Sequence, residues 1–142
     1  MSLIRQAALP ALILSAACHH GGAPGAAPAP KMPAGVTAQM IAQGDSAVHA
    51  PTAFCQRCHG AGLTGGTNGP SLVAGAWLQS GGTFPEITLI VINGVPKDKI
   101  KDPAHTFQMN AHGGPMNLTD DQARVIAAYV WSISRAKTKP AG

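Results

Sequence analysis

Two cysteines and a histidine stand close together in the segment Cys55-Gln56-Arg57-Cys58-His59. This CxxCH pattern is the signature of covalent c-type haem attachment. On a helix of about 100° per residue, Cys55 and Cys58 lie one turn apart on the same side, so both sulfurs can reach one edge of a porphyrin. His59 falls on the neighbouring flank and turns toward the iron. The motif therefore predicts haem c, one per chain, held covalently at Cys55 and Cys58 with His59 on the iron.

Other uses of paired cysteines fit this sequence less well. A zinc site needs a second pair of Cys or His ligands at similar spacing, and the remaining cysteine, Cys18, lies near the N-terminus. A thioredoxin-like redox pair would accompany alternating strands and helices, which this chain does not show. A disulfide between Cys55 and Cys58 would need no adjacent histidine. The chain also contains no pattern typical of a catalytic acid–base pair or an activated nucleophile, so we expect a protein that is not an enzyme.

The elements that position the motif are predicted to be helices. A short helix is expected over 37–43, ended by Gly44, and a second one carries 54–59. Thr83, an early Pro85 and Glu86 form a helix start, and Asn93-Gly94 ends that helix. The β-branched residues after Glu86 would also suit a buried strand, but the cap favours a helix.

The last helix has the strongest signals. Thr119 and Gln122 form a capping box, with acidic residues at the positive end of the helix dipole. Apolar residues then recur with helical spacing along one face: Ile126, Tyr129, Val130 and Ile133. Eight glycines lie between positions 60 and 82, which predicts a loop with one helical turn near 74–78. No strand pattern is convincing, so the predicted fold class is all-α, a small helical domain wrapped around one haem.

Composition divides the chain into four parts: a signal peptide over 1–17, a flexible linker over 18–34, the folded domain over 35–136 and a frayed tail over 137–142. Arg5 and the apolar run that follows are typical of an export signal, and the run is shorter than the roughly 20 residues that span a bilayer. Residues 14–18 resemble a lipoprotein box, although Ser15 occupies a position where Leu is preferred. Cys18 is then a lipid attachment site, or cleavage near Ala17 releases the domain. Either alternative predicts a periplasmic or otherwise extracytoplasmic location.

Further motifs follow the attachment segment in a fixed order. These are Gly69-Pro70-Ser71-Leu72, then Met109 ahead of Gly113-Gly114, then Leu118-Thr119-Asp120 leading into Ala127-Ala128-Tyr129-Val130. With this order, roughly residues 36–134 resemble the class I cytochrome c family. The resemblance implies a mono-haem domain that passes single electrons.

The resemblance also implies roles for particular residues. His59 would be the proximal iron ligand, with its second ring nitrogen held by the backbone carbonyl of Pro70. Trp77 would donate its indole N–H to a haem propionate, or else pack in the core. Gly44 and Tyr129 would mark the crossing of the first and last helices.

The sixth iron ligand follows from the same resemblance. Met109 occupies the family position, ahead of a Gly-Gly turn and the final helix. Met116, His105 and His112 remain alternatives, and Met116 would otherwise fill space in the core. Many members have proline after the ligand methionine, whereas this chain has Asn110. The rigidity of that loop, and hence the strength of the iron–sulfur bond, depends on this difference.

Iron with His59 and Met109 on its two faces has no vacant position, which favours electron transfer over substrate binding. The alternatives are an electron-entry subunit of a larger respiratory oxidase or quinoprotein dehydrogenase, and an open-iron haem sensor or peroxidase. The net charge is +4, with Lys97, Lys99 and Lys101 just before the ligand segment, where they form a solvated loop or a docking patch for an acidic partner. Redox proteins are the expected partners, together with a membrane if Cys18 is lipidated; nucleic acid is not expected.

Overall fold

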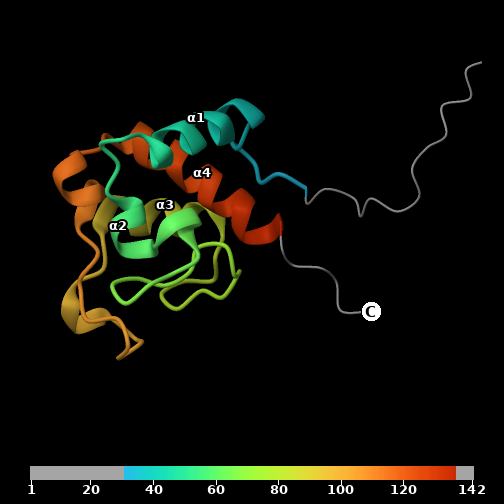
Figure 1. Ribbon diagram of the computed structural model, residues 1–142. Helices are drawn as coiled ribbons and strands as arrows, with labels where there is room; N and C mark the ends of the chain where they lie inside the picture. Colours follow the sequence, from blue (N-terminus) through green and yellow to red (C-terminus); the bar gives the residue numbers. More distant parts are fainter. Residues whose placement is uncertain (1–30, 137–142) are drawn as a thin grey trace, which may run out of the picture.

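The computed structural model describes residues 31–136, which form helices joined by long loops (Figure 1). In chain order the elements are α1 (Ala38–His49), α2 (Cys55–His59), the 3₁₀ turn η1 (Ala61–Leu63), α3 (Phe84–Asn93), η2 (Lys97–Lys99), η3 (Ala111–Met116) and α4 (Asp120–Ala136). Within 31–136 there are two isolated β-bridges and no strand. The predicted all-α fold class is confirmed. The predicted signal peptide, Cys18 and the C-terminal tail lie outside the described residues.

α1 packs across α4, and the crossing depends on a glycine (Figure 1). A Cβ atom on Gly44 would collide with the backbone carbonyl of Val125 and lie 2.7 Å from the Cβ of Tyr129. The prediction that Gly44 and Tyr129 mark this crossing is confirmed. The prediction that α1 ends at Gly44 is wrong, because α1 continues to His49. Glycine costs about 1 kcal/mol in a helix interior, and here the close approach of two backbones outweighs that cost.

Threonine caps begin the three longer helices. The Thr37 hydroxyl accepts the Met40 N–H at 3.1 Å, and Thr83 and Glu86 form the predicted capping box at α3. At α4, Thr119 and Gln122 bond reciprocally, with distances of 2.9 and 3.2 Å. The prediction of a helix rather than a strand after Thr83 is therefore confirmed, because these local caps fix where each helix begins.

The glycine-rich segment from 60 to 82 is a loop, as predicted, except for η1 at its start. The helical turn expected near 74–78 is wrong, since these residues form bends and irregular backbone. Gly75 has φ +70°, a left-handed conformation that does not continue a right-handed helical turn.

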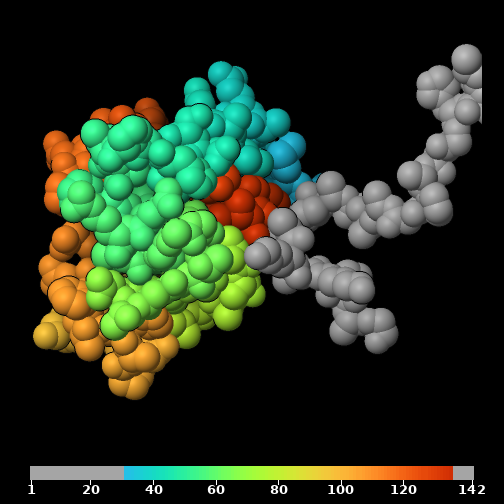
Figure 2. Space-filling model, viewed as in Figure 1, coloured from blue at the N-terminus to red at the C-terminus, as the bar shows by residue number. Residues whose placement is uncertain are grey.

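The core lies between α1, α3 and α4. Ile126 and Val130 of the predicted α4 face are 3% and 4% exposed, while Tyr129 and Ile133 are half-buried at its edge. Other buried members come from all three helices: Val48, Phe84, Ile87, Val91, Ala123, Ala127 and Trp131. Residues 31–136 contain no helix long and apolar enough to cross a membrane. The 60–82 loop and the 97–118 segment adjoin on one face of the molecule (Figure 2).

Candidate functional site

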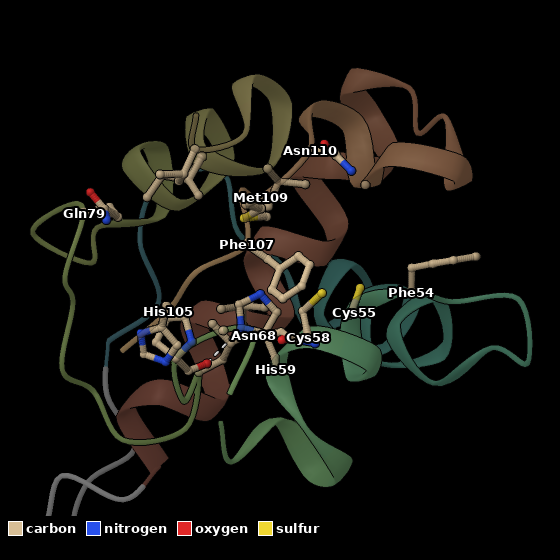
Figure 3. Close-up of a pocket in the computed structure, with 18 of the residues that line it drawn as sticks. Phe54, Cys55, Cys58, His59, Asn68, Gln79, His105, Phe107, Met109 and Asn110 are labelled. Carbon is tan, nitrogen blue, oxygen red and sulfur yellow. Dashed lines mark hydrogen bonds between the residues drawn. The ribbon is translucent and has the colours of Figure 1, made fainter. Parts of the chain in front are cut away.

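A cavity of about 220 Å³ lies between α2, the two long loops and the inner faces of α3 and α4. Cys55, Cys58 and His59 enter it from α2, and Met109 enters it from the opposite side (Figure 3). Most of the remaining lining is apolar: Val48, Leu72, Ile87, Ile90, Val91, Val95, Ile126 and Val130. Such a lining disfavours water and suits an apolar group.

The two cysteines lie one turn apart on α2, and both sulfurs point into the cavity (Figure 3). In the part of the chain that the structure describes, both are free thiols. Burial raises the pKa of the Cys55 thiol, because a buried thiolate would lose its hydration. The pair is therefore available as thiols and shares the side of the helix that the CxxCH spacing predicts.

His59 is held in one orientation by the loop that follows it. Its Nδ1–H donates a hydrogen bond to the carbonyl oxygen of Pro70 at 2.8 Å. A Cβ atom on Gly69 would lie 3.2 Å from this nitrogen, so the glycine allows the close approach. Burial lowers the pKa of the His59 imidazole, and the bond to Pro70 opposes that shift only in part. A neutral ring with a proton on Nδ1 leaves Nε2 as a free lone pair that can bind a metal.

Met109 is fixed through its backbone. Its N–H and carbonyl both pair with Val95, with distances of 3.0 and 2.8 Å, directly after α3 ends at Gly94. In Figure 3 its sulfur lies across the cavity from His59, with the ring of Phe107 between them in this view. Asn110, which replaces the family's proline, accepts a hydrogen bond from Gln108 Nε2 at 2.8 Å. Hydrogen bonds of the side chains and the backbone thus restrain this segment in the absence of proline.

The alternative sixth ligands have different surroundings. The Met116 sulfur also lines the cavity but accepts the backbone N–H of Phe54 at 3.3 Å. His112 does not contribute to the cavity lining, and its Nδ1–H donates to the Leu118 carbonyl at 2.8 Å. His105 lines the cavity beside Asn68, near the loop that holds His59 (Figure 3). Among the described residues, the Met109 sulfur faces the cavity without a hydrogen bond, and His105 Nδ1 also makes none, although it lies 3.3 Å from a carboxylate oxygen of Asp102.

Trp77 is half-buried and lines the same cavity. Its indole lies against Gly82, where any side chain would collide with the ring. The carbonyl of Gly82 in turn accepts a hydrogen bond from Arg135 on α4 at 2.8 Å. The packing role and the propionate role predicted for Trp77 are compatible with this position.

Three residues contribute to the site in ways that the sequence did not indicate. Phe107, 61% exposed, lies at the mouth of the cavity beside the attachment residues (Figure 3), and nothing in its sequence context distinguishes it from a loop residue. Gly94 and Gly113 both have positive φ and lie against backbone or side chains of the ligand segment. The Asn-Gly helix end signalled Gly94 as a cap, but its contact with residues 109–111 required the tertiary structure.

The donor groups present fit haem better than a metal held by protein alone. Among residues 31–136 no three His, Cys, Asp or Glu side chains gather closely enough to hold a metal ion. What does gather is two thiols on one helical turn, one imidazole and one thioether, inside an apolar cavity. This donor set matches a macrocycle attached at its edge and ligated on both faces.

Comparison with known proteins agrees with this chemistry. The Cytochrome c family model matches residues 41–134. The chain belongs to the cytochrome c family. The resemblance to class I members is thereby confirmed, and membership implies haem c as the cofactor. The roles of individual residues in this cytochrome c domain remain predictions.

The similar curated proteins are subunits of cbb3-type cytochrome c oxidases. Over 86 residues the chain is 35% identical to subunit CcoP of Rhodobacter capsulatus, covering 57% of this chain and 27% of that protein. It is 31% identical over 86 residues to subunit FixPc of Rhizobium leguminosarum bv. viciae, covering 61% and 29%. The cytochrome c domain thus spans less than a third of the length of these relatives. No solved structure gives a significant match.

Proposed function

We propose that this cytochrome c is a one-electron carrier with one covalent haem c, attached at Cys55 and Cys58 and ligated by His59 and Met109. The observation that carries the proposal is the orientation of His59, whose Nδ1–H is occupied by Pro70 at 2.8 Å while the ring faces an apolar cavity. His112 also donates its Nδ1–H to a carbonyl, but His112 does not line the cavity, whereas His59 faces it opposite a thioether.

The residues of the chain would perform separate tasks. Bound haem c supplies an iron that alternates between the ferrous and ferric states. Cys55 and Cys58 hold the macrocycle by its edge, and the Pro70 carbonyl keeps Nε2 of His59 unprotonated and aimed at the metal. The apolar lining excludes water, and a thioether from Met109 favours the less charged ferrous state, so both raise the reduction potential. His59 and Met109 would together leave no ligand position for a substrate, so the site would favour electron transfer over substrate binding.

The first test uses the full chain produced in a host that attaches haem c. We expect a peroxidase-active band after denaturing electrophoresis and a mass increase of one haem, both lost in Cys55→Ser/Cys58→Ser. A colourless, unmodified polypeptide would refute covalent attachment. A mass increase of two haems would refute the single-haem stoichiometry.

The second test concerns the sixth ligand. The ferric protein should be low-spin, with the weak far-red absorption band of methionine sulfur on iron. Met109→Ala should abolish this band, while Met116→Leu, which keeps the side-chain size, should retain it. Loss of the band in Met116→Leu alone would transfer the assignment to Met116. Binding of carbon monoxide by the native ferrous protein would instead favour an open-iron sensor or peroxidase.

We further propose that the domain, residues 35–136, works outside the cytoplasm and is tethered by a lipid on Cys18. The support is the sequence pattern of the export signal, the lipoprotein box and the Gly/Ala/Pro-rich segment after it. Incorporation of radiolabelled palmitate that is lost in Cys18→Ser would support the tether. Equal labelling in both proteins, or none in either, would refute it.

A second candidate function is electron entry into a larger respiratory complex. It is favoured by the names of the relatives, which are oxidase subunits, and by the exposed lysines of the 97–101 segment, which suit an acidic protein partner. Co-purification of a tagged chain with a stoichiometric oxidase would support this role. Recovery of the cytochrome alone under mild detergent and low salt would favour a free carrier.

A further inference from the structure

Met116 is the cavity methionine that the proposed ligand set leaves without a role. Its sulfur accepts the backbone N–H of Phe54 at 3.3 Å, across a sequence separation of 62 residues. Phe54 is the N-cap residue of α2 and directly precedes Cys55. This hydrogen bond therefore joins the segment that follows Met109 to the helix that carries both attachment cysteines.

The donor in this bond has few other partners. A helix leaves its first N–H groups without intrahelical acceptors, and within the described chain no side chain caps α2 through an ordinary cap bond. The Phe54 carbonyl accepts the Arg57 N–H at 3.1 Å and so belongs to the helix. The Phe54 N–H donates instead to the Met116 sulfur.

The segment that carries the acceptor, Met116, is fixed by hydrogen bonds of its own. Residues 112–118 close into a ring, because the Leu118 N–H donates to the His112 carbonyl at 2.9 Å and His112 Nδ1–H donates to the Leu118 carbonyl at 2.8 Å. Asn117, in the left-handed conformation, turns the chain toward α4. A Cβ atom on Gly113 would lie 3.3 Å from the Met116 sulfur, so this glycine leaves room for it. The ring therefore constrains the backbone on both sides of Met116.

We propose that Met116 is a positioning residue that latches the Met109 segment onto α2 and so limits how often the Met109 sulfur leaves the iron. The inference rests on the proposed His59/Met109 ligation and deepens it. The segment is then held at two points, at Met109 by Val95 and downstream by the bond from Phe54 to Met116. A thioether is a weak acceptor, so its removal should raise the rate of ligand loss by about two- to five-fold.

The experiment measures imidazole binding to the full-length ferric protein by stopped flow. At saturating imidazole the observed rate reports departure of the native sixth ligand. Met116→Leu keeps the volume and removes the acceptor, while Met116→Gln restores an acceptor at similar length. Val36→Ala is the control for general loosening, because Val36 is 6% exposed in the core and does not line the cavity.

We expect a rate about two- to five-fold above wild type in Met116→Leu, and a rate at or below wild type in Met116→Gln. Val36→Ala should lower the denaturation midpoint without changing the rate. An unchanged rate in Met116→Leu, or equal acceleration in Val36→Ala, would refute the latch. Retention of the far-red band in Met109→Ala would refute the proposed ligation itself, whatever the rates in the Met116 variants.

Discussion

Gly94 links the stability of the fold to the placement of Met109, and Gly94→Ala tests that link. Gly94 ends α3 with φ +69° and ψ −167°, a region that side-chain-bearing residues avoid at a cost of about 1–3 kcal/mol. A Cβ atom there would collide with the Met109 carbonyl and lie 2.7 Å from the Ala111 nitrogen and 2.9 Å from the Asn110 carbonyl carbon. These neighbours are backbone atoms that cannot rotate away.

The two costs add because they arise from different contacts. Crowding a packed site costs about 1–3 kcal/mol, so Gly94→Ala should lose about 2–6 kcal/mol of unfolding free energy in total. Gly62→Ala is the matched control, since Gly62 has φ +66° and no heavy atom within 4 Å of a Cβ. Gly62→Ala should lose only the free energy of placing alanine in a left-handed backbone conformation, about 1–2 kcal/mol.

The assay is guanidinium unfolding of the ferric protein, followed by helical circular dichroism and by the far-red band. Gly94→Ala should unfold at a clearly lower midpoint than Gly62→Ala. Because the added methyl group displaces residues 109–111, its far-red band should weaken before the helices unfold. Equal free energies of unfolding in the two variants, or an undiminished band in Gly94→Ala, would refute this account of how α3 supports the ligand segment.

Three further predictions concern the helices. Gly44→Ala should destabilise the protein by roughly 1–2 kcal/mol, because the clash with Val125 exceeds the gain in helix propensity. Ala42 is exposed in the same helix, so Ala42→Gly measures the propensity difference alone. A Gly44→Ala variant more stable than wild type would contradict the crossing geometry. Thr83→Ala should cost about 1 kcal/mol by thermal unfolding through loss of the α3 cap, whereas Thr83→Ser should cost little. Hydrogen bonds from Thr83 hold the pKa of the Glu86 carboxyl below its ordinary value. The stability that the ionised Glu86 contributes is therefore present above about pH 4.3 and is lost as pH falls through the lowered pKa of the folded state. The difference in unfolding free energy between wild type and Glu86→Gln should shrink in acid, and a constant difference would argue against the bond.

Signals that act within a few residues were sufficient for much of the fold. The Thr83/Glu86 and Thr119/Gln122 boxes predicted where two helices begin, since each box satisfies backbone donors of its own first turn. The face of α4 followed from the period of its apolar residues. Gly44 was predicted both as a helix end and as part of the helix crossing, and only the crossing is correct, because the close approach to α4 outweighs the intrinsic penalty of glycine inside α1.

The candidate site likewise has a part that the local sequence predicts and a part that depends on the tertiary structure. The CxxCH spacing alone determined that two sulfurs and an imidazole share one short helix, because rotation per residue is a local property of the chain. The family resemblance implied that the Pro70 carbonyl holds His59, but only the tertiary structure decided how closely the two approach and which methionine sulfur bonds to Phe54, because those contacts join residues 11 to 62 positions apart. Their geometry depends on how the loops close over the helices, which no local preference specifies.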